Sequence, residues 1–105
     1  MEEYTQVKGV KYYLPPYLLS KLSKLEQVIL VAIYQKPFIR RCELSNICRR
    51  CGVSYGYSMD KTLQRMCEHN VIKVKRVGRN RYYLLTEEYE PLGKILRDKL
   101  VIDSL

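Results

Sequence analysis

Apolar residues recur at three- and four-residue spacing in four stretches of the chain, and this period predicts amphipathic helices. The stretches are 16–36, 42–52, 56–69 and 91–105. In the first, Ser23 and Glu26 form a possible capping box that would start a second helical segment, and Pro37 ends the stretch. Gly52 and Asn70 follow the two middle stretches, and both residue types tolerate the left-handed backbone that ends helices.

Residues 71–86 instead alternate between apolar and polar or basic positions, with a glycine-containing turn in the middle, and this pattern predicts a β-hairpin. We expect Tyr83 to face the core and Tyr82 to face the surface. Residues 38–40 predict a short extended piece, and residues 4–14 predict a short strand or an arm. The order of elements indicates one α+β domain over residues 1–105, which is a length that suits a single domain.

The net charge of +8 is concentrated in the middle of the chain. Residues 35–83 carry 12 basic and 3 acidic side chains, net +9, whereas residues 1–34 carry net +1 and residues 84–105 carry net −2. Such localisation favours a polyanionic partner for the middle segment over a general role in solubility.

The apolar runs are too short for a membrane span, which needs about 20 residues, so we expect no membrane partner. The N-terminus lacks a hydrophobic signal core. We therefore expect an intracellular, cytoplasmic protein, located in the host cytoplasm if the source is a virus.

Three motifs are typical of one family: Leu63-x-x-Met66, then Asn70-Val71-Ile72, then the run from Arg81 to Glu88. Over roughly residues 20–90 the chain resembles the winged helix-turn-helix DNA-binding domains of compact archaeal and archaeal-virus transcription regulators. Asn70 stands where this family usually has glycine. The resemblance implies a three-helix core, a short strand and a β-hairpin wing, here with additional N- and C-terminal helical segments.

The helix over 56–69 is the expected recognition helix, because an α-helix fits the major groove and its exposed face must carry hydrogen-bonding groups. The expected base-reading residues, opposite its apolar face, are Tyr57, Ser58, Lys61, Gln64 and Arg65. The residues expected on phosphates, from the preceding helix and the hairpin, are Asn46, Arg49, Arg50, Lys73, Lys75, Arg76, Arg79, Asn80 and Arg81. We therefore expect a sequence-specific transcription regulator that binds double-stranded DNA. Two alternatives are a winged-helix protein-interaction module of a transcription or replication complex, and an RNA-binding winged helix.

Apolar residues outside the minimal winged domain predict a homodimer, since two-fold regulators read paired half-sites. The expected interface residues are Leu18, Leu22, Leu92, Ile95, Leu96 and Leu100. The alternative is that these side chains pack on their own domain.

Four cysteines and one histidine are candidate zinc ligands: Cys42, Cys48, Cys51, Cys67 and His69. The pair Cys48 and Cys51 has ligand spacing, but it falls on the apolar face of a helix, and a second close pair is missing. We favour buried thiols over a disulfide, and a disulfide over a metal. We expect His69 to be an ordinary residue at a helix C-terminus, where a cation is favoured. No catalytic constellation is present, so neither an enzyme nor a cofactor is expected.

Overall fold

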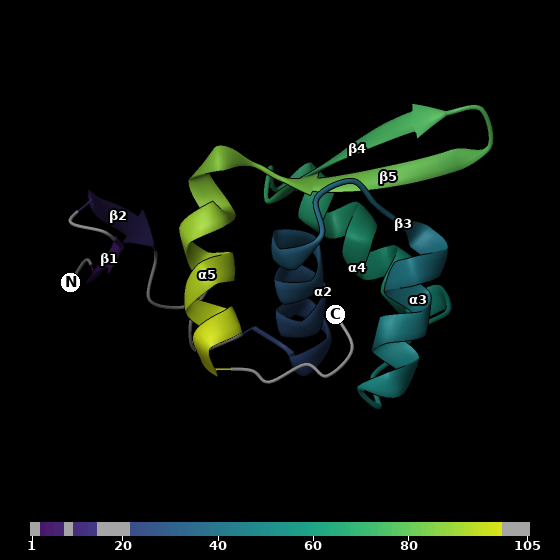
Figure 1. Ribbon diagram of the computed structural model, residues 1–105, viewed down its shortest axis with the longest axis horizontal. Coiled ribbons are helices and arrows are strands. Elements are labelled where there is room, and N and C mark those ends of the chain that lie inside the picture. Colours follow the sequence, from purple (N-terminus) through teal and green to yellow (C-terminus); the bar gives the residue numbers. More distant parts are fainter. Residues whose placement is uncertain (1–2, 8–9, 15–21, 100–105) are drawn as a thin grey trace.

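The computed structural model describes residues 3–7, 10–14 and 22–99. Within this part of the chain, four α-helices and two small antiparallel sheets give an α+β fold (Figure 1). The elements in chain order are β1 (Glu3–Val7), β2 (Val10–Leu14), α2 (Lys24–Gln35), β3 (Ile39–Arg40), α3 (Arg41–Arg50), α4 (Tyr57–Glu68), β4 (Ile72–Val77), β5 (Asn80–Leu85), a 3₁₀ turn η1 (Glu87–Tyr89) and α5 (Glu90–Lys99).

Helix α2 lies in the middle of the molecule, and its six consecutive residues 28–33 are all buried. A helix that is apolar on every side needs neighbours all round, and α3, α5 and the sheet strand β5 supply them. The helix begins after Ser23, whose Oγ accepts from the Glu26 backbone N–H at 3.2 Å while the Glu26 carboxylate accepts from the Ser23 N–H at 3.3 Å. The capping box is therefore confirmed. Of the predicted stretch 16–36, residues 16–21 lie outside the described residues.

Helices α3 and α4 correspond to the helices predicted over 42–52 and 56–69, and their bounds differ from the predicted ones by one or two residues. Gly52 has φ +73° and Asn70 has φ +62°, so both residues end their helices in left-handed backbone as predicted. After α4, the Val71 N–H donates to the Met66 carbonyl at 2.9 Å, which reverses the chain toward the sheet.

The three-stranded sheet has the order β3-β5-β4, with β5 central. Its hairpin confirms the one predicted over 71–86, and Tyr83 is buried as expected while Tyr82 is half-buried. The hairpin is closed at its base by Thr86, whose hydroxyl donates to the Asn70 carbonyl at 2.8 Å. In Figure 1 the hairpin extends beyond the helices, over the ends of α3 and α4.

Helix α5 packs against α2 through Gly93, where a Cβ atom would lie 2.8 Å from Tyr34 Cβ. Of the C-terminal helix predicted over 91–105, residues 100–105 lie outside the described residues. At the N-terminus, where we expected one strand or an arm, β1 and β2 pair with each other as two antiparallel strands, and β1 contacts α5.

Candidate nucleic-acid interface

Helix α4 presents a polar stripe to solvent, with its apolar face on the core. Met59, Leu63 and Met66 are buried. Tyr57 is 76% exposed, and Lys61 and Gln64 follow it along the exposed side. The Lys61 ammonium lies 5.1 Å from the centre of the Tyr57 ring, a cation–π distance that steadies both side chains.

A groove of about 470 Å³ runs between this stripe and the β4–β5 hairpin. Lys61 and Gln64 line it from α4, and Arg76 and Arg81 line it from the two strands. The remaining lining residues are Tyr57, Asp60, Leu63, Cys67, Val74 and Tyr83. The groove therefore brings hydrogen-bonding groups of a helix and guanidinium groups of a hairpin to one surface.

A neighbouring hollow of about 410 Å³ lies between the start of α3 and the tip of the hairpin. Four arginines and one carboxylate are among the residues that line it: Arg40, Arg41, Asp60, Arg79 and Arg81, with Cys42 and Asn80 beside them. Its lining is net positive, because a single acidic side chain accompanies four guanidinium groups. Such a set suits a phosphate, which guanidinium forks bind with two parallel hydrogen bonds.

Asp60 lines both the groove and the neighbouring hollow. The Arg41 guanidinium donates to both Asp60 carboxylate oxygens at 2.7 Å, and this bidentate pair ties the first residue of α3 to the first turn of α4. The hydrogen bond from Arg41 lowers the pKa of Asp60, and the charges of Arg41 and Arg81 act in the same direction. The carboxylate therefore stays ionised and orients Arg41 toward the hollow.

The predicted base-reading residues do not all lie together. Tyr57, Lys61 and Gln64 line the groove, whereas Ser58 and Arg65 do not. The Arg65 guanidinium lies 3.9 Å from the Glu26 carboxylate of α2, which holds it toward the other flank of α4.

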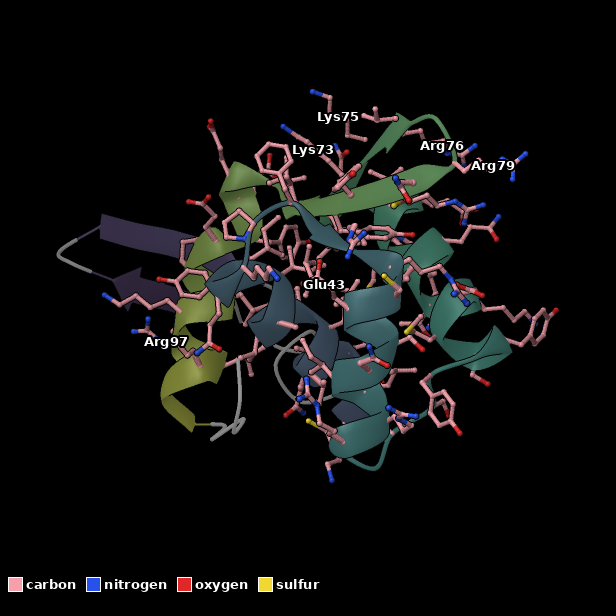
Figure 2. All side chains as sticks on the ribbon, turned by 45° about the vertical axis from the view of Figure 1, so that its right-hand side comes forward. Glu43, Lys73, Lys75, Arg76, Arg79 and Arg97 are labelled. Carbon is pink, nitrogen blue, oxygen red and sulfur yellow. The ribbon has the colours of Figure 1, made fainter. Side chains whose placement is uncertain are left out.

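The predicted phosphate contacts are also divided. Arg76, Arg79, Asn80 and Arg81 line one or both hollows. Asn46, Arg49 and Arg50 are exposed along α3, with Arg49 3.5 Å from the Asn46 side-chain oxygen, and line neither hollow. Lys73 and Lys75 lie on the opposite face of the sheet and point away from the helices in Figure 2.

Four charged residues of this surface were not predicted from the sequence. Arg40, Arg41 and Asp60 line the hollow near the hairpin tip, and Glu68 accepts from the Gln64 amide at 3.4 Å. A local signal existed for two of them, because the adjacent Arg40 and Arg41 stand where an extended segment leads into a helix. No local signal links Arg41 to Asp60, which lies 19 positions later.

Of the six residues expected in a dimer interface, the structure describes four, and two of these are buried within this chain. Leu92 is 1% exposed and Leu96 is 7% exposed, so these two side chains belong to the core of their own domain and the interface assignment is wrong for them. Leu22 and Ile95 are half-buried, and Leu22 packs on the core. Leu18 and Leu100 lie outside the described residues. A homodimer stays a prediction.

All four cysteines are free thiols in the structure. Cys48 is buried, and burial raises the pKa of its thiol to about 11; Cys51 and Cys67 are partly buried. Cys42 is exposed, so the expectation of buried thiols is wrong for this residue. His69 is the exposed C-cap of α4, as expected. Among the described residues, no group of three or more cysteine, histidine or acidic side chains is placed to hold a metal ion.

No protein-family model matches the chain, and no curated protein matches it by sequence. In the part of the chain that the structure describes, no helix is both long enough and apolar enough to cross a membrane.

Proposed function

We propose that the chain is a winged helix-turn-helix protein that binds double-stranded DNA and acts as a transcription regulator. In this assignment α3 and α4 form the helix-turn-helix, α4 is the recognition helix, and the β4–β5 hairpin is the wing. The observation that carries the proposal is the groove between α4 and the hairpin, where hydrogen-bonding and cationic side chains face one surface.

The chemistry of each side of the groove suggests a division of labour. Lysine can bind guanine O6 and N7 and glutamine can bind adenine N6 and N7 in the major groove, so Lys61 and Gln64 are the proposed base-reading pair. Guanidinium groups bind phosphate oxygens without reading sequence. Arg79 and Arg81, together with the start of α3, would therefore hold the DNA backbone beside the recognition helix.

Two sets of variants test this assignment against random-sequence duplexes and against a duplex selected from a random library. We expect Arg79→Ala with Arg81→Ala to weaken binding to all duplexes alike, because both side chains would contact only the backbone. Lys61→Ala or Gln64→Ala should cost the selected duplex about tenfold or more relative to random sequence, because a good base contact discriminates by about 1–3 kcal/mol. Fluorescence anisotropy measures both affinities.

Lys24→Ala is the matched control, because Lys24 is an exposed cation on the first turn of α2 and lines neither hollow. It should leave duplex binding unchanged. If the α4 variants and the hairpin variants both bind like the wild-type protein, the proposed interface is wrong.

A further inference from the structure

The three-stranded sheet has two faces with different surroundings. Residues paired directly across antiparallel strands share a face. Tyr83 pairs with Val74, and Arg81 pairs with Arg76, and all four line the groove beside α4. The other face therefore holds the alternate residues, which we call the outer sheet face: Arg40, Lys73, Lys75, Val77, Asn80, Tyr82 and Leu84.

An aromatic ring lies at the centre of the outer sheet face, between cations. Tyr82 pairs with Arg40 on β3 and with Lys75 on β4, so one row across the sheet reads cation, aromatic ring, cation. Lys73 stands in the next row beside Leu84. The ring is half-buried and the three cations are exposed.

The charged side chains of the outer sheet face are all basic. Strands β4 and β5 contain no acidic residue. Two acids lie near this face: Glu43, on α3, whose carboxylate accepts from Arg40 at 3.3 Å and pairs with Lys36, and Glu90, which lines a hollow together with Leu84. Lys73 and Lys75 lie two residues apart on one strand, about 7 Å by the rise of a β-strand, which is close to the spacing of neighbouring phosphates in an extended single strand.

A second exposed aromatic ring, that of Phe38, comes immediately before β3 in the chain. The Phe38 N–H donates to the Tyr83 carbonyl at 3.0 Å, so the Phe38 backbone lies beside β5, just before β3 begins. Phe38 is 52% exposed and has φ +63°, a backbone conformation that costs an aromatic residue about 1–2 kcal/mol. Because the residue is half exposed, its ring contributes little to core packing, and its exposed side is free to contact a partner.

We propose that the outer sheet face binds single-stranded nucleic acid, with bases stacked on Tyr82 and Phe38 and phosphates paired with Lys73 and Lys75. Unpaired bases stack on aromatic side chains irrespective of sequence, whereas the bases of a duplex are stacked on one another. An acidic peptide would use the cations but gain nothing specific from the rings. Lys73, Lys75 and Tyr82 line neither the groove nor the hollow assigned to duplex DNA, so the protein would hold a duplex and a single strand on opposite faces of one sheet.

The test measures anisotropy of a labelled oligothymidylate of about twelve nucleotides, within the usual site size of single-strand-binding surfaces. We expect Tyr82→Leu and Phe38→Ala each to weaken binding about tenfold, because stacking on a ring stabilises each base. Lys73→Gln with Lys75→Gln should weaken it further and make it less dependent on salt. Circular dichroism checks that each variant is folded.

Arg76→Gln is the matched control, because Arg76 lies on the same strand with the same charge but faces the groove. It should weaken duplex binding and leave oligothymidylate binding within about twofold. An equal loss of oligothymidylate binding in Arg76→Gln and in the double lysine variant overturns the placement on the outer sheet face.

Two further outcomes also overturn the proposal. In the first, the double lysine variant weakens oligothymidylate binding while both aromatic variants bind normally. Polyglutamate with the same total charge also displaces the oligonucleotide. The outer sheet face is then a general surface for acidic polymers or peptides. In the second, excess unlabelled duplex displaces the oligonucleotide from the wild-type protein, so both share one site. Failure of duplex binding alone, with intact binding of the single strand, would count against the proposed function and not against this inference.

Discussion

At the scale of single residues, the ion pair of Arg41 and Asp60 links stability to pH. Both hydrogen bonds measure 2.7 Å, and each side chain is a little more than one third exposed. Solvent therefore screens the pair, and its contribution to the free energy of unfolding is about 0.5–1 kcal/mol. The pair joins α3 to α4 at the edge of the candidate interface, so its loss would affect both stability and the alignment of Arg41.

We expect Asp60→Asn to lower the free energy of unfolding by about 0.5–1 kcal/mol at pH 7, with much less loss near pH 2. The folded-state pKa of Asp60 lies below its ordinary value of about 3.9. Its contribution is therefore fully present above that ordinary value and is lost as the pH falls through the folded pKa. Urea unfolding followed by circular dichroism at several pH values measures the difference.

The control for this titration is Glu88→Gln, which changes an exposed carboxylate on η1. It should leave the free energy of unfolding nearly unchanged at pH 7. A deficit of Asp60→Asn that is equally large at pH 7 and pH 2 would mean that the carboxylate stabilises the fold through something other than its charge.

At the scale of elements, the sequence predicted the helices and the hairpin because their signals are local. Periodic apolar positions and the residues Ser23, Gly52 and Asn70 marked the helix positions and ends, and alternation marked β4 and β5. Alternate residues of a strand point to opposite faces of the sheet. Even so, the sequence did not predict which hairpin cations lie on the face beside α4 and which lie on the outer sheet face. Which face meets α4 is decided by packing between elements, and the pairing of Arg41 with Asp60 likewise depends on where α3 and α4 come together.

The contact of α2 with α5 gives the sharpest prediction about an element. A Cβ atom on Gly93 would lie 2.8 Å from Tyr34 Cβ and 2.9 Å from Leu85 Cδ1, and the first of these atoms is fixed close to the α2 backbone. Gly93→Ala gains about 1 kcal/mol in helix propensity, but overpacking costs about 1–3 kcal/mol. We expect a net loss of about 1 kcal/mol in the free energy of unfolding, measured by urea titration.

Lys94→Ala is the matched control for this contact, since it places the same residue at the next position of α5 while leaving the close approach intact. Its free energy of unfolding should stay within about 0.5 kcal/mol of the wild-type value. If Gly93→Ala proves more stable than the wild-type protein, α5 can move away from Tyr34 and the close approach does not constrain the fold.

At the scale of the whole molecule, the cations of the hairpin are divided between the two faces of the sheet. Arg76, Arg79 and Arg81 surround the groove and the hollow, while Lys73 and Lys75 cover the outer sheet face. Helix α3 begins next to the sheet and leads away from it, so Arg50 lies about 13 Å farther along the helix axis than Arg41. The salt dependence of the proposed duplex binding can therefore test which cations would contact the DNA backbone.

The logarithm of the association constant for a duplex falls linearly with the logarithm of salt concentration, by about 0.9 for each phosphate that the protein neutralises. We expect Arg79→Ala to reduce the magnitude of this slope by about 1, because Arg79 lines the hollow beside the hairpin tip. Arg50→Ala should leave the slope unchanged, since Arg50 lines neither hollow. Duplex titrations at four or more salt concentrations measure both slopes. The reverse result, a smaller slope for Arg50→Ala alone, would move the duplex from the hairpin end of the molecule to the exposed side of α3.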